Sequence, residues 1–134
     1  DAPAGDCQLS NNWDEQPGPG GQGDDCVSGV GAYDMIGNVW EWVSDEVVAG
    51  VYRATNLPAA GYIQAMSSSG LPAQTADKPN QGYGDDYLWL KTGGLKAVAK
   101  GGYYDSGSDG GRYSTYVEAS PSFTGPGVGF RCVK

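Results

Sequence analysis

The chain has 134 residues, of which 23 are glycine and 8 are proline, and its formal net charge is −8. That charge, with only 8 lysines and arginines, disfavours a nucleic-acid backbone or an anionic membrane surface as partner, and no stretch approaches the ~20 apolar residues of a membrane span. With 4 Trp, 9 Tyr and 2 Phe to form a core, we expect one domain over residues 1–134, rich in loops and short strands.

The first 30 residues contain the signals of a loop. A proline- and glycine-rich run over residues 16–25 cannot hold a regular element. The segment contains Cys7 and Cys26, and the third cysteine is Cys132. A disulfide between Cys7 and Cys26 would hold this loop, but three reduced thiols are equally consistent with the spacing. Three cysteines without histidine form a poor zinc site.

The first dense apolar block covers residues 31–46, and within it Val39 to Val43 predicts a short, largely buried strand. Residues 67–80 are typical of a loop. The long middle third indicates insertions on a compact scaffold. Shorter apolar or alternating runs predict further strand segments at residues 51–53, 62–66, 87–90, 96–100, 113–117 and 128–132.

No catalytic constellation is present in the sequence. The chain has no histidine, which excludes Ser-His-Asp, Cys-His and His-metal arrangements. The paired acids Asp24/Asp25 and Asp85/Asp86 lie in glycine-rich contexts, where solvated loop acids are the default expectation. Two carboxylates adjacent in sequence do not indicate a glycosidase pair, which must face each other across a sugar.

The block from Gly31 to Asp45, GAYDMIGNVWEWVSD, resembles the signature of the formylglycine-generating enzyme (sulfatase-modifying factor) family. The runs KGGYY from Lys100 and GFRC ending at Cys132 resemble two later motifs of that family, in the same order. The resemblance implies an α+β, C-type-lectin-like fold with short antiparallel strands and long irregular loops. The family's N-terminal hairpin and first helix have no obvious counterpart, so either this version is minimal or an upstream part is absent.

Two acids in this block are candidate metal ligands. Asp34 and Glu41 flank a Gly-Asn turn, a spacing that lets carboxylates and intervening carbonyls converge on a hard cation. The resemblance implies a calcium ion held by the side chains of Asp34 and Glu41 and by the carbonyls of Gly37 and Val39. Acids that only cap turns are the alternative. We expect no required cofactor, with calcium as the possible exception.

The family's oxidase activity does not transfer to this chain. The formylglycine-generating enzyme uses two cysteines just after the motif that corresponds to KGGYY, and no cysteine lies between Cys26 and Cys132 here. Serine and glycine cannot supply thiolate chemistry. We therefore expect that the protein is not an enzyme.

Residues 101–132 also resemble the variable region of proteins diversified by a retroelement, which share the C-type-lectin-like fold. The glycines, serines and prolines and the closing GFRC match fixed positions of that pattern. Where the template has asparagine, adenine randomisation in the codon yields Tyr, Asp, Ser, Ala, Phe or Gly. Glu118 needs a different template codon, and Tyr104 stands where tryptophan is usual. The predicted contact residues are Tyr103, Tyr104, Asp105, Ser106, Asp109, Tyr116, Glu118, Ala119, Phe123, Gly125 and Gly127.

The composition of this segment is consistent with a binding role. Of the 25 residues from 103 to 127, 14 are Tyr, Ser or Gly, a mixture that gives large contact area and adaptable polar groups in binding loops. An ordinary Gly/Ser loop with structural tyrosines is the alternative reading. The resemblance implies a hypervariable display protein on a cell or virion surface that binds a protein ligand or receptor on another cell or particle. The competing hypotheses are an inactive formylglycine-generating-enzyme-like accessory and a calcium-dependent sugar-binding module.

Overall fold

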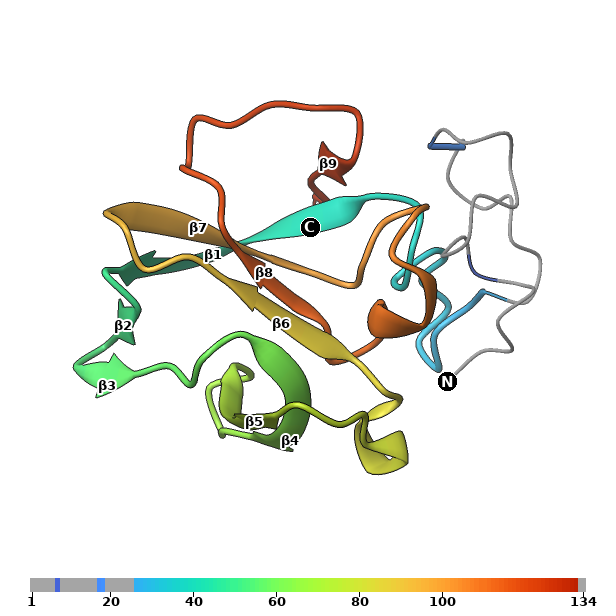
Figure 1. Cartoon of the computed structure of the whole chain (residues 1–134). Helices are drawn as coiled ribbons and strands as arrows, with labels where there is room; N and C mark the ends of the chain where they lie inside the picture. The colour runs from blue at the N-terminus through green and yellow to red at the C-terminus, as the bar shows by residue number, and fades with distance from the viewer. Residues whose placement is uncertain (1–6, 8–16, 19–25, 133–134) are drawn as a thin grey trace.

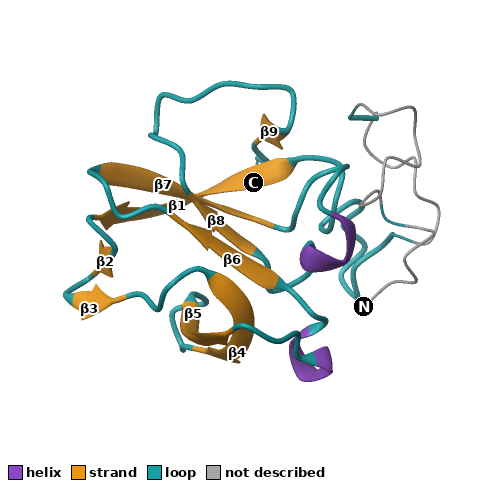
Figure 2. Ribbon diagram, in the orientation of Figure 1, coloured by secondary structure: helices purple, strands orange, loops and turns teal. Residues whose placement is uncertain are grey.

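The computed structural model describes Cys7, residues 17–18 and residues 26–132. In this part of the chain, nine β-strands and two 3-10 turns are joined by loops, and no α-helix is formed (Figures 1 and 2). Most of the predicted N-terminal loop over residues 1–30 lies outside the described residues.

The strands form one mixed sheet in the order β3-β2-β1-β7-β8-β6-β4-β5, and β9 pairs in parallel with β1. The pairs are antiparallel except β1 with β9 and β6 with β8. The sheet curls, so β4 and β5 lie below β6 and β8 in Figure 1. The bounds are β1 Trp40–Val48, β2 Val51–Tyr52, β3 Thr55–Asn56, β4 Gly61–Met66, β5 Pro72–Ala76, β6 Tyr87–Leu90, β7 Leu95–Lys100, β8 Thr115–Val117 and β9 Val128–Gly129, with turns η1 Gln81–Tyr83 and η2 Gly107–Asp109.

The hydrophobic core draws on six of these strands. Its largest fully buried apolar side chains are Ile63 of β4, Leu88 of β6 and Val47 of β1. Each such side chain contributes about 1.5–3 kcal/mol through removal from water. Val98 of β7 and Val117 of β8 complete the centre of the cluster, with Tyr52 of β2 and Leu71 also buried against it.

The predicted α+β class is wrong for the described residues, because they contain no α-helix. That prediction followed from the family resemblance, and the residues themselves favour strands. The longest element, β1, reads WEWVSDEVV, and its aromatic and β-branched residues are typical of a pleated, half-buried surface. A C-type-lectin-like arrangement remains compatible with this mixed sheet.

The predicted strand segments near 51–53, 62–66, 87–90 and 96–100 are confirmed as β2, β4, β6 and β7. The segments at 113–117 and 128–132 contain the shorter strands β8 and β9. The prediction of a loop over residues 67–80 is wrong in part, because β5 lies within it and pairs with β4. Its sequence PAQTA has almost no apolar signal, and the backbone pairing with β4 fixes its conformation.

Cys7 and Cys26 form a disulfide, which resolves the ambiguity of the three cysteines. Cys26 is also anchored beyond the disulfide, since its backbone carbonyl accepts a hydrogen bond from the amide of Asp34 at 2.9 Å. Cys132 is a free and exposed thiol. The disulfide therefore attaches Cys7 to the start of the described domain, next to the loop that leads into β1.

Candidate functional site

Trp40, the first residue of β1, is the centre of an aromatic array. Its side chain is only 5% exposed. Its ring stacks on the rings of Tyr103 and Tyr116, with centroids 6.3 and 5.4 Å away. The ring of Trp89 meets it edge-on at 5.3 Å. Tyr103 and Tyr116, two of the predicted contact residues, are thus brought together by a tryptophan more than 60 residues earlier in the chain.

The array continues across the sheet through residues that were not among the predicted contact residues. Trp89 contacts Tyr87 at 5.0 Å between centroids, and Tyr87 contacts Tyr62 edge-on at 5.1 Å. The register explains this order, because Tyr116 of β8 lies opposite Trp89 of β6 and Tyr62 of β4 lies opposite Tyr87. The alternation of Tyr87 and Trp89 along β6 is the one sequence signal that places both rings on the same face.

Tyr103, Tyr104 and Ser106 form a tight turn at the edge of the array. The ring of Tyr104 packs edge-on against that of Tyr103 at 5.1 Å. The amide of Tyr103 donates to Ser106 Oγ at 2.8 Å, and the amide of Tyr104 donates to the carbonyl of Asn38 at 3.0 Å. These bonds fix the backbone and leave the rings half-buried, with Asp105 exposed beside them.

The acidic contact residues lie next to tyrosines of the array. The hydroxyl of Tyr62 donates a hydrogen bond to Asp109, and the charge of that carboxylate is the main reason that the pKa of Tyr62 is raised. Glu118 forms an ion pair with Lys91 at 3.3 Å. Burial, with a smaller contribution from the charge of Glu118, raises the pKa of Tyr116.

The remaining predicted contact residues differ in their surroundings. Phe123 is 45% exposed in the long loop between β8 and β9, which arches over the sheet in Figure 1. A Cβ atom on Gly125 would lie 3.1 Å from the Phe123 ring, and one on Gly127 would lie 3.0 Å from the ring of Tyr103. Ala119 is only 7% exposed, so its side chain offers little surface to a partner.

Three positions beside or between the contact residues are buried and closely packed: Gly101, Gly111 and Ser114. Gly101 has φ +96°, and a Cβ there would lie 2.9 Å from the carbonyl oxygen of Met35. A Cβ on Gly111 would lie 2.3 Å from a carboxylate oxygen of Asp86. Ser114 is fully buried and exchanges hydrogen bonds with the backbone of Gly111. These three positions leave little room for a larger side chain, whereas other positions of the segment outside the contact residues, such as Ser108, Arg112 and Ser120, are exposed.

The expectation that the paired acids Asp85/Asp86 are solvated is wrong for Asp86. Its side chain is 2% exposed and accepts a hydrogen bond from the amide of Tyr113 at 2.6 Å. Burial raises its pKa from 3.8 to about 6. Burial also lowers the pKa of the neighbouring Lys100 from 10.5 to about 8, although the Asp86 charge opposes that shift. The predicted acid pair Asp24/Asp25 lies outside the described residues.

Lys100 joins three segments beneath the contact face. Its ammonium donates to Thr115 Oγ1 at 2.6 Å and to the carbonyls of Gly70 and Tyr113 at 3.1 and 3.3 Å. Together with Asp86, it fixes the turn that leads into β8. These buried polar groups hold the segment from Gly111 to Thr115 in place, which positions Tyr116 on the outer face.

Three of the four predicted calcium ligands, Asp34, Val39 and Glu41, line one cavity, but an arginine already neutralises Glu41. A cavity of about 390 Å³ is lined by Asp34, Asn38, Val39, Glu41 and Arg131, among others. Both carboxylate oxygens of Glu41 accept from Arg131, at 2.5 and 3.1 Å, and the same guanidinium donates to the carbonyl of Asp34 at 3.2 Å. Gly37 is held through its amide, which donates to the carbonyl of Gly101 at 2.8 Å.

This arrangement fits a guanidinium better than a calcium ion. Glu41, the acid expected to bind calcium, uses both oxygens on Arg131, and a second cation at the same oxygens would be repelled by that charge. Among the described residues, no group of three or more Asp, Glu, His or Cys gathers into a metal-binding cluster.

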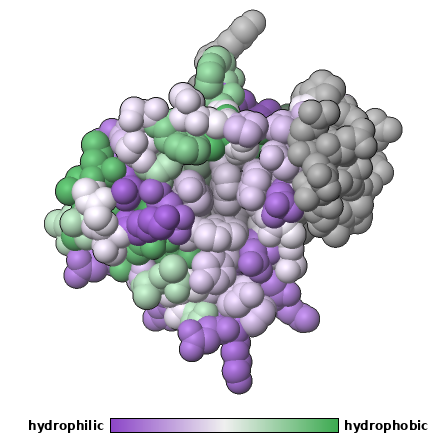
Figure 3. All heavy atoms as spheres, turned by 45° about the horizontal axis from the view of Figure 1, so that its top comes forward, coloured by the Kyte–Doolittle hydropathy of each residue, from purple (hydrophilic) through white to green (hydrophobic). Residues whose placement is uncertain are grey.

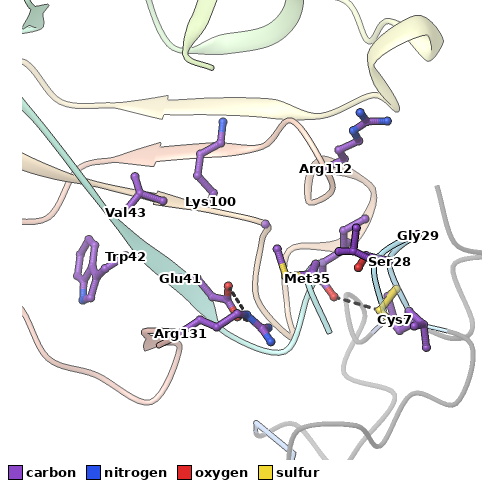
Figure 4. A pocket seen from close by; sticks show the side chains of 15 residues that line it. Cys7, Ser28, Gly29, Met35, Glu41, Trp42, Val43, Lys100, Arg112 and Arg131 are labelled. Atoms are coloured by element: carbon purple, nitrogen blue, oxygen red, sulfur yellow. Dashed lines mark hydrogen bonds and ion pairs between the residues drawn. A yellow bond between two sulfur atoms is a disulfide. The ribbon is translucent and has the colours of Figure 1, made fainter. Parts of the chain in front are cut away.

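A larger cavity of about 780 Å³ lies beside the disulfide and is also lined by Glu41 (Figure 4). Its wall includes Val27, Met35 and Trp42, with Arg112 and Arg131 at its edge. Lys100 also contributes, but its side chain points away from the ion pair of Glu41 and Arg131 (Figure 4). None of the eleven predicted contact residues lines this cavity. The cavity and the aromatic array are therefore separate features.

Figure 3 shows the side of the molecule on which the loop between β8 and β9 comes forward. Most of this face has pale or purple colours, so its residues are of intermediate or hydrophilic character. Within the described residues, no helix is long and apolar enough to cross a membrane.

Comparison with known proteins identifies the family. The sulfatase-modifying factor enzyme 1-like domain family matches residues 10–134. Neither the search of curated proteins nor that of solved structures returned a match. The matched range covers most of the chain, including every strand, the aromatic array and the pair of Glu41 and Arg131. The chain therefore belongs to the family of sulfatase-modifying factor enzyme 1-like domains.

Proposed function

We propose that this protein is a non-enzymatic display protein whose segment 103–127 forms a diversified surface for a protein ligand. One observation carries the proposal: the rings of Tyr103 and Tyr116 stack on Trp40 and that of Tyr104 packs on Tyr103, whereas Gly110 and Gly111 between them are buried. Diversification by codon randomisation needs this separation, because a varied position must change without unfolding the domain.

The chemistry of the face supports binding in preference to catalysis. Tyrosine rings supply large contact area at a low cost in conformational entropy, and serine and glycine adapt to a partner's shape. The chain has no histidine, and no cysteine lies where the family's oxidase has its thiolate pair. We extend the proposal to location: a protein with this role faces outward on a cell or a virion.

The genomic DNA beside the gene tests this proposal. We expect a near-copy of the codons for residues 101–132 that differs only at adenines, together with a reverse-transcriptase gene. Copies of the gene in related genomes should differ at the contact residues and agree at positions such as Gly111 and Ser114. A neighbourhood without either element, and copies that vary equally along the chain, would favour an inactive accessory of the sulfatase-modifying family.

A further inference from the structure

The aromatic array extends beyond the segment assigned to binding. Tyr62, Tyr87 and Trp89 come from β4 and β6, outside residues 103–127, yet they form one continuous row with Trp40. All three side chains are half-buried, so part of each ring remains accessible. The aromatic array therefore has two parts: tyrosines of the variable segment 103–127, and Tyr62, Tyr87 and Trp89 from β4 and β6.

Carboxylates surround this row of rings. Asp109 accepts a hydrogen bond from Tyr62, and the charge of Asp85 also acts on that tyrosine. Burial, with a smaller contribution from a carboxylate charge, raises the pKa of Tyr103 beside Asp105 and that of Tyr116 beside Glu118. Among the described residues, Lys91 forms an ion pair with Glu118 at this face, at 3.3 Å. Four acidic side chains thus lie near tyrosines of this row, in a chain whose net charge is −8.

The chemical group that best complements electron-rich rings bordered by carboxylates is a guanidinium. A guanidinium stacks on the face of a tyrosine or tryptophan and donates in parallel to a carboxylate, and both contacts strengthen each other. An acidic segment or a phosphorylated partner would be repelled by the same surface. Arginine is preferred over lysine, because its planar group satisfies the ring and the carboxylate together.

We propose that the fixed aromatic residues Tyr62, Tyr87 and Trp89, together with Asp109, form an arginine-binding part of the interface, which receives a basic segment of the partner protein. This inference rests on the proposed binding function and adds two elements to it: contact residues outside the variable region and the charge of the partner. Asp109 lies at the junction, because it belongs to the variable segment and bonds to the fixed Tyr62.

The test uses the full chain and three synthetic peptides of equal length, in which glycine and serine alternate with arginine, lysine or glutamate. Calorimetric titration at physiological ionic strength measures the affinity of each. The arginine peptide should bind more tightly than the lysine peptide, and the glutamate peptide should not bind. Tyr87→Leu and Asp109→Asn should each weaken arginine-peptide binding about fivefold, the range expected for one stacked or charge-assisted contact.

Two matched variants control for charge and ring content elsewhere on the surface. Glu46→Gln removes one exposed acid from β1, and Tyr33→Leu removes a ring that is 47% exposed outside the array. Both should bind the arginine peptide as the parent chain does, and Tyr87→Phe should retain binding because it keeps the ring. Circular dichroism checks that each variant is folded, and if Tyr87→Leu is not, the comparison of Asp109→Asn with Glu46→Gln decides.

The inference is overturned if the arginine peptide does not bind, or if Asp109→Asn and Glu46→Gln weaken its binding equally, since that would indicate general charge attraction. Neither result bears on the proposed diversified surface, which depends on the neighbouring DNA. Conversely, a genome without the template repeat would remove the proposed function and leave the peptide measurement unchanged.

Discussion

At the scale of single residues, Gly111 shows how little room the framework positions have. A Cβ there would lie 2.3 Å from a carboxylate oxygen of Asp86, which is itself buried and hydrogen-bonded. We predict that Gly111→Ala lowers the free energy of unfolding by about 1–3 kcal/mol, as over-packed sites do. Gly29→Ala is the control, because no atom lies within 4 Å of the added Cβ, and it should change stability by less than about 0.5 kcal/mol in urea denaturation.

Contact residues also constrain each other. A Cβ on Gly127 would lie 3.0 Å from the Tyr103 ring, so a large residue at 103 favours a small one at 127. We predict that Gly127→Asn destabilises the parent chain and costs less when Tyr103 is alanine, with a coupling of about 0.5–1 kcal/mol in a double-mutant cycle. Purely additive effects would mean that the two positions vary independently. The same cycle with the exposed Asp105 in place of Tyr103 should be additive.

Asp86 makes stability depend on pH. Its pKa is about 6 in the folded chain, above the ordinary value of 3.8, so the folded state binds this proton more tightly than the unfolded state. This group's contribution favours folding fully below about pH 4 and is lost as the pH rises through 6. We predict that Asp86→Asn flattens the stability profile between pH 4 and 6 in thermal melts. Asp77→Asn, which removes an exposed acid, should keep the slope of the parent chain.

At the scale of the elements, the ion pair of Glu41 and Arg131 fastens the end of the chain to β1. Arg131 follows β9, and β9 pairs in parallel with the first residues of β1. Because the guanidinium occupies both oxygens of Glu41, we predict that the thermal midpoint is the same in excess calcium and in a chelator. A midpoint that rises with calcium would show that the ion displaces Arg131.

A double-mutant cycle with Glu41→Gln and Arg131→Gln should give a favourable coupling of up to about 1 kcal/mol, since both side chains are partly exposed.

The strands also differ in how well they could be predicted from the sequence. The aromatic and β-branched runs predicted most of the strands, because burial of such residues on a pleated face leaves a local pattern. β5 left no such pattern, since its residues are mainly exposed and only the pairing with β4 defines it. The predicted helical component was inherited from the resemblance and had no support in the residues.

Only the part of the candidate site that is contiguous in sequence could be predicted. Residues 103–127 are contiguous, so their composition and spacing can be read directly. Tyr62 and Trp89 join them only through the pairing of β4, β6 and β8, which are distant in sequence. The role of Asp86 was misjudged because a glycine-rich neighbourhood suggested a solvated loop, whereas β6 and the turn before β8 bury that carboxylate.

For the molecule as a whole, we propose that a sheet with buried positions such as Gly111 and Ser114 carries a surface that tolerates change. The most direct measurement displays the full chain on phage in two libraries. One library randomises the ten predicted contact positions other than Tyr104, and the other randomises ten exposed positions elsewhere on the described surface. Both are selected against the same purified basic protein.

We predict that the first library keeps a high folded fraction, judged by protease resistance, and gives binders that depend on the selected residues and on Trp40, whereas the second gives few or none. Equal yields of binders from the two libraries, or a first library that is mostly degraded by protease, would contradict the account.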